Sequence, residues 1–151
     1  MAYKLPNPER ERTERRRELK RLRTKTDPGP ERAERSAELA VIFHEHREIN
    51  HVMELAQLVV EDVDDGVGVL LSAYLDGVEG VEDQMERLAM LANVGRWTEL
   101  TDLEAAARDK GLDAAVRWTR SVDDEIEQAE RLSVVERRFD EDLRKQVQQS
   151  L

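Results

Sequence analysis

The most regular pattern of apolar and polar positions runs from residue 31 to about residue 64. Large apolar side chains, with His46 among them, recur there at alternating spacings of three and four, which predicts one long helix with a continuous packing seam. A second stripe at the same spacing lies about 150° around the same helix, so we expect neighbours on two sides. The predicted packing seam comprises Leu39, Ile42, His46, Ile49, Met53, Ala56, Val60 and Val63.

The rest of the chain shows helical spacing as well. Gly66 is well placed for a left-handed cap that ends the first long helix, and the short connection after it favours an antiparallel neighbour. Gly77 and Gly80 predict a bend in that neighbour, whereas Gly111 and Asp113 predict the end of one helix and the start of the next. The expected helices are about 31–64, 67–93, 102–110 and 114–149, with a kink near Ser133 in the last. The predicted fold is an all-α, antiparallel helical bundle of long helices within 31–151.

The first 26 residues form a different kind of segment. Asn7 and Pro8 suit the start of a helix, but Leu19 and Leu22 are its only regularly spaced large apolar residues. Proline and glycine in residues 27–30 predict a hinge after it. We therefore expect a separate helical arm that is mobile or held by a partner.

Charge distinguishes this arm from the body more strongly than apolar content does. Residues 1–26 carry ten basic and four acidic side chains, a net charge of +6, whereas the remainder carries 14 basic and 30 acidic ones, a net charge of −16. Such a basic segment suits an acidic protein surface, and contact with nucleic acid is the less favoured alternative because the acidic remainder of the chain would repel a polyanion. The residues predicted to dock a partner are Arg15, Arg16, Arg17, Lys20, Arg21 and Arg23.

Composition narrows the classes of protein that the chain could belong to. It has no cysteine, which excludes disulfides, thiolate metal sites and a cysteine nucleophile. No apolar run is long enough for a membrane span, and the first residues lack a signal-peptide core. We expect a protein that acts in the cytoplasm or in a particle assembled inside the cell, without a membrane partner.

All three histidines lie in residues 43–56, within the predicted long helix. His44, Glu48 and His51 follow one another at spacings of four and three, so their side chains would project from one side of that helix. Glu48 and His51 form a Glu-x-x-His motif that resembles those of ferritin-like di-iron bundles, and residues 45–49 resemble the opening helix of hemerythrin-like domains. The resemblance implies iron or manganese, with Glu79 and Glu82 as further oxygen ligands. As alternatives, the histidines are interfacial polar groups, or His46 makes the packing seam sensitive to pH.

No other catalytic constellation occurs in the sequence, so catalytic residues and cofactors are not expected. The leading hypothesis is a non-enzymatic structural or interaction protein, a subunit of a homo-oligomer or larger assembly that docks through the two-sided helix 31–64 and the basic arm. The alternatives are an iron-binding bundle related to ferritin or hemerythrin, with oxidase or storage activity, and a nucleic-acid-associated protein.

Overall fold

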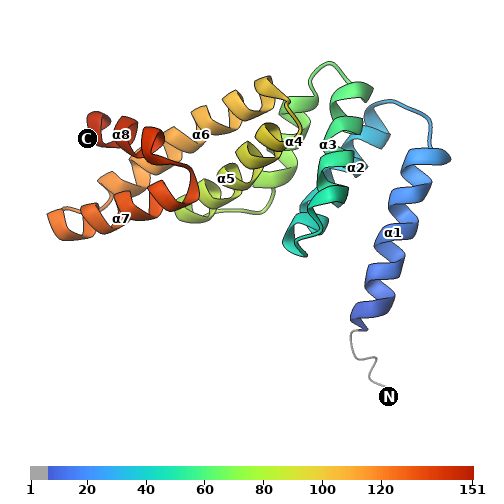
Figure 1. Ribbon diagram of the computed structural model, residues 1–151, viewed down its shortest axis with the longest axis horizontal. Helices are drawn as coiled ribbons and strands as arrows, with labels where there is room; N and C mark the ends of the chain where they lie inside the picture. Colours follow the sequence, from blue (N-terminus) through green and yellow to red (C-terminus); the bar gives the residue numbers. More distant parts are fainter. Residues whose placement is uncertain (1–6) are drawn as a thin grey trace. The chain divides into compact units, whose positions relative to one another are not determined.

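The computed structural model describes residues 7–151, and within them every regular element is an α-helix (Figure 1). The all-α fold class predicted from the sequence is therefore confirmed. The chain divides into two compact units at Val69 and Leu70, and each unit is described below by itself. The helices are α1 Pro8–Thr24, α2 Pro30–Glu45, α3 Ile49–Asp62, α4 Gly66–Leu75, α5 Val81–Trp97, α6 Thr101–Arg120, α7 Glu125–Arg138 and α8 Glu141–Ser150.

In the first unit, α2 and α3 form a hairpin where the sequence predicted one long helix. A tight turn at residues 46–48 separates them, and Arg47 has a φ of 59°, in the left-handed region. The amide of Arg47 donates to the carbonyl of His44, and the amide of Glu48 donates to that of Phe43, each at 3.0 Å. These two bonds form a Schellman motif, which ends a helix and satisfies its last carbonyls. The apolar spacing continues through the turn, so the spacing alone did not reveal it.

Replacing Arg47 with glycine is expected to stabilise the protein by up to about 1 kcal/mol, because an L side chain is strained in the left-handed conformation and glycine is not. Equilibrium unfolding in urea measures the change in the free energy of unfolding. The control is Arg17→Gly in the interior of α1, which should destabilise the helix. A destabilising Arg47→Gly substitution would contradict the role given to this turn.

Helix α1 packs against α2 and α3 although its sequence offers few apolar residues. Leu19 is 3% exposed and Leu22 is 5% exposed, so these two side chains are buried in the first unit. Asn7 caps the helix as predicted, with its side chain accepting a hydrogen bond from the amide of Arg10 at 3.3 Å. Two leucines three positions apart thus give the basic segment a buried face, which the sequence-based picture of a separate arm did not include.

The second unit is built on the hairpin of α5 and α6 (Figure 1). The bend predicted at Gly77 is real, since its φ is 72° and the chain leaves α4 there. Gly111, however, does not end a helix. It is buried inside α6, where an added Cβ would lie 2.4 Å from the Phe139 ring. The missing side chain makes room for the Phe139 ring, and α6 continues past Gly111 to Arg120.

Three other predicted helix ends also differ in the structure. Gly66 starts α4, packed against Val60, and does not cap the preceding helix in a left-handed conformation. Asp113 lies inside α6 and caps nothing. The predicted helix 114–149 is divided at two places, and neither is near Ser133. The first break follows Arg120, and Asp124 caps the start of α7 by accepting a hydrogen bond from the amide of Ile126 at 2.9 Å. The second lies near Phe139, where the Asp140 side chain accepts a hydrogen bond from the amide of Leu143 at 2.9 Å and starts α8. Among residues 7–151, no helix is both long enough and apolar enough to cross a membrane.

Candidate interaction surface on the basic helix

The inner face of α1 surrounds the carboxylate of Glu48, at the turn between α2 and α3. The Nε of Arg12 donates to Glu48 at 3.2 Å, a terminal nitrogen of Arg16 does so at 3.4 Å, and a terminal nitrogen of Arg15 lies 3.9 Å from its other oxygen. The side chains of Arg15 and Glu48 are only 12% and 15% exposed. A cavity of about 320 Å³ adjoins the group. One carboxylate therefore holds three arginines, and two of them, Arg15 and Arg16, are residues that the sequence assigned to a partner.

An aromatic group lies beside this cluster. The guanidinium of Arg15 lies 6.0 Å from the centroid of the Phe43 ring, a cation–π arrangement, and the rings of Phe43 and His51 have centroids 5.0 Å apart. His51 thus packs against a buried ring.

Two further ion pairs link α1 to the same unit. Arg23 pairs with Glu54 of α3, and Glu18 accepts hydrogen bonds from Arg35 of α2, one of them at 2.9 Å. Glu18, and after it Glu38, raise the pKa of Arg35 above its ordinary value by accepting hydrogen bonds from its guanidinium. Because these side chains are partly exposed, each pair contributes at most about 1 kcal/mol, and their main effect is to orient α1.

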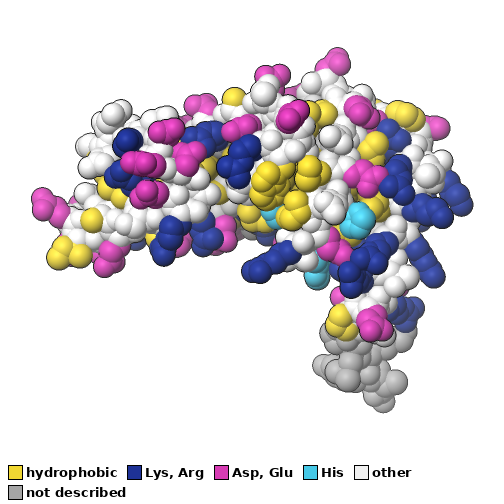
Figure 2. Space-filling model, viewed as in Figure 1, with side chains coloured by type: hydrophobic (Ala, Val, Ile, Leu, Met, Phe, Trp, Pro, Cys, Tyr) yellow, Lys and Arg dark blue, Asp and Glu magenta, His cyan; other side chains and the backbone are white. Residues whose placement is uncertain are grey.

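The opposite side of α1 is basic and unpaired. Arg17, Lys20, Arg21 and Lys25 are exposed and project away from Leu19, and we call these four residues the outer basic face. None has an ion pair within 4.0 Å among residues 7–151, whereas the nearby Arg10 pairs with Glu14. Figure 2 shows Lys and Arg side chains along this helix. The arginines of the inner face are therefore ion-paired within the unit, whereas the cations of the outer face are not.

The structure does not assemble the predicted metal ligands into a site. His44 lies in the last turn of α2, Glu48 precedes α3 and His51 lies in its first turn, because the turn at residues 46–48 breaks the helix that would have aligned them. Glu48 is occupied by arginines, and Glu79 and Glu82 are exposed in the second unit. Across the part of the chain that the structure describes, no three His, Asp or Glu side chains are grouped so that they could hold a metal ion.

The turn at residues 46–48 also divides the predicted packing seam between α2 and α3. Leu39 and Ala56 are fully buried. His46 is exposed at the end of α2 and lines the cavity beside Glu48, so it does not occupy the core position that the spacing indicated. The remaining members are half-buried: Ile42, Ile49, Met53, Val60 and Val63.

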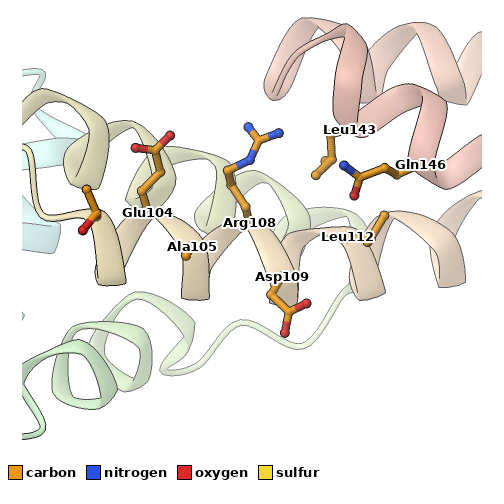
Figure 3. Close-up of a pocket in the computed structure, with 8 residues that line it drawn as sticks. Glu104, Ala105, Arg108, Asp109, Leu112, Leu143 and Gln146 are labelled. Carbon is orange, nitrogen blue, oxygen red and sulfur yellow. The ribbon is translucent and has the colours of Figure 1, made fainter.

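The second unit has a groove of about 360 Å³ between α6 and α8 (Figure 3). Arg108 points toward α8, whereas Asp109 points away from it. Two terminal nitrogens of Arg108 donate to the Asp140 carboxylate at 2.7 and 3.2 Å, and this pairing lowers the pKa of Asp140. The guanidinium of the groove is thus already neutralised, and its contact holds α8 against α6.

Sequence reasoning identified the cations of α1 but not the acids that divide them into two groups. Glu48 was assigned to a metal site, and both Glu48 and Glu54 lie more than thirty positions from their arginine partners. Only an estimate of which face of α1 carries Leu19 and Leu22 could have separated the two groups of cations. No family model matches this chain, and no curated protein or solved structure matches it either.

Proposed function

We propose that this protein is a non-enzymatic assembly subunit that associates with other copies of itself through the outer basic face of α1. The observation that carries the proposal is the division of α1 into two faces. On the inner face, acids of the same unit form ion pairs with the arginines. On the outer face, Arg17, Lys20, Arg21 and Lys25 form no ion pair within 4.0 Å among residues 7–151. Four unneutralised cations on a chain with a net charge of −10 favour contact with an acidic surface.

The size of this face suits a protein contact. The four residues extend from Arg17 to the C-cap residue Lys25, eight residue steps or about 12 Å at a rise of 1.5 Å per residue. Lysine and arginine also have long aliphatic stems, so such a face can cover apolar atoms of a partner while its charges stay hydrated. Contacts of this kind give orientation and rapid association more than high affinity, and salt weakens them.

Sedimentation velocity over a wide range of protein concentrations tests the proposal. We expect the average mass to rise above the 17.4 kDa of one chain at low salt, and to fall again at about 0.5 M salt, where charges are screened within a few ångströms. The double variant Arg17→Glu/Arg21→Glu should remain a single chain under the same conditions. Its matched control is Lys110→Glu/Arg117→Glu, which makes the same charge change at exposed positions of α6 and should associate like the wild type.

Two results would overturn the proposal. One is a mass of a single chain at every concentration in low salt. The other is tight binding of duplex DNA that weakens with salt and disappears in Arg17→Glu/Arg21→Glu, with no self-association, since the outer basic face would then bind phosphates.

A further inference from the structure

The end of α7 that begins at Asp124 carries a dense group of unpaired acids. We call it the acidic end of α7: Asp123, Asp124, Glu125, Glu127 and Glu130, together with Ile126. All six side chains are exposed, and none of the five carboxylates has an ion pair within 4.0 Å among residues 7–151. Asp124 also caps the helix by accepting a hydrogen bond from the amide of Ile126 at 2.9 Å. Figure 2 shows acidic and apolar side chains together at this end of the helix.

Ile126 distinguishes this group from an ordinary solvated charge cluster. Its side chain is 71% exposed, compared with 39% for Trp97 and 45% for Leu151, the other large apolar side chains that lie open among residues 7–151. Most of the Ile126 side chain, which lies among five acidic residues, is therefore in contact with water and not with its own unit. Covering it with aliphatic atoms would remove apolar surface from water and so favour a complex.

The outer basic face of α1 matches this surface in charge, length and chemistry. It has four cations over about 12 Å of helix, and the acidic end has five carboxylates over a similar length. The stems of Arg17 and Arg21 can cover an apolar side chain while their guanidinium groups reach carboxylates on either side of it. No apolar pocket is required for this contact.

We propose that the outer basic face of α1 binds the acidic end of α7 on a second copy of the chain. This inference rests on the proposed self-association and names the partner surface. Because the two surfaces differ, the contact is heterologous: each added copy leaves one basic and one acidic surface free. Association therefore continues into chains, or closes into a ring if the rotation between copies allows it.

A charge-swap experiment tests the pairing. In the first variant, Arg17→Glu/Arg21→Glu makes α1 acidic; in the second, Glu127→Lys/Glu130→Lys makes the end of α7 basic. Each variant alone should self-associate at least tenfold more weakly than the wild type at low salt, because like charges then meet. An equimolar mixture should associate again, since the acidic α1 of one chain meets the basic α7 end of the other. Sedimentation velocity measures both quantities, and circular dichroism verifies that each variant is folded.

Two further variants test whether the charge effect is specific to α7 and whether the apolar contact contributes. Asp109→Lys/Asp113→Lys makes the same charge change at exposed positions of α6 and should leave self-association unchanged. Ile126→Ser leaves every charge in place and should weaken self-association severalfold at low salt, because the lost contact is apolar.

The outcomes separate this inference from the proposed function. If the wild type associates and loses association in Arg17→Glu/Arg21→Glu but not in Glu127→Lys/Glu130→Lys, the outer basic face acts in assembly and the acidic end of α7 is not its partner. Failure of the two variants to associate when mixed also overturns the pairing. A wild type that stays a single chain at every concentration overturns both proposals.

Discussion

Replacing Asp62 with alanine is expected to destabilise the first unit by about 3–5 kcal/mol, because it leaves a buried guanidinium without its counter-charge. The side chains of Arg32 and Asp62 are 9% and 2% exposed. The Nε of Arg32 donates to one carboxylate oxygen at 2.6 Å, and a terminal nitrogen donates to the other. By accepting these hydrogen bonds, Asp62 raises the pKa of Arg32. A guanidinium is basic enough to stay protonated without this help, so the arginine remains charged when its partner is removed.

The position of this pair explains why its loss should affect the whole unit. Arg32 lies in the first turn of α2 and Asp62 at the end of α3, so the pair joins the two ends of the hairpin. The remaining terminal nitrogen of Arg32 lies 3.4 Å from the carbonyls of Leu22 and Thr26, which close the end of α1. One guanidinium on α2 thus bonds to the end of α3 and to the end of α1.

Equilibrium unfolding in urea tests this prediction against two comparisons. Glu38→Ala removes a half-exposed partner of Arg35 and should change the free energy of unfolding by less than about 1 kcal/mol. The double variant Arg32→Met/Asp62→Leu replaces the pair with apolar side chains of similar size and should recover most of the loss. If Asp62→Ala is as mild as Glu38→Ala, the pair does not hold the unit together.

The helical class was predictable because apolar spacing of three and four persists over most of the chain, and spacing responds to burial rather than to the exact helix ends. The breaks were harder to predict. Arg47 and Glu99 each adopt a φ of 59° and occupy turns where glycine is the usual residue, so no glycine or proline marked those ends. Conversely, Gly111 resembled a helix end, and in the structure it makes room for the Phe139 ring. Glycine was therefore an unreliable sign of a helix end in this chain, because helices end without it and it also occurs inside a helix.

The basic face proposed as an interaction surface was predictable only in part. Net charge is additive along a sequence, so the basic character of residues 1–26 was evident without a structure. Which cations stay free depends on acids that come close only after folding, and the arginines near Glu48 are 32 to 36 positions away from it. Of the six residues predicted to dock a partner, Arg15, Arg16 and Arg23 are paired within their own unit, whereas Arg17, Lys20 and Arg21 remain on the outer basic face.

Replacing Gly95 with alanine is expected to destabilise the second unit by about 1–3 kcal/mol, and replacing it with leucine by more, because the α5–α6 hairpin leaves no room for a side chain there. An added Cβ would lie 2.5 Å from the backbone nitrogen of Glu104 and 2.8 Å from its Cα. Backbone atoms cannot rotate away as a side chain can, so the two helices would have to separate. Alanine favours a helix by about 1 kcal/mol relative to glycine, and the clash must exceed that gain.

Gly80→Ala is the matched control for Gly95→Ala, since Gly80 precedes the same helix with a φ of −73° and its added Cβ would meet only the Asp83 side chain, at 3.3 Å. The control should cost less than about 1 kcal/mol in urea unfolding. The order of stability expected is therefore Gly80→Ala above Gly95→Ala above Gly95→Leu. A Gly95→Ala variant as stable as the wild type would contradict the prediction. It would mean that a Cβ at position 95 fits against the Glu104 backbone, and that close approach of the two backbones does not hold the hairpin together.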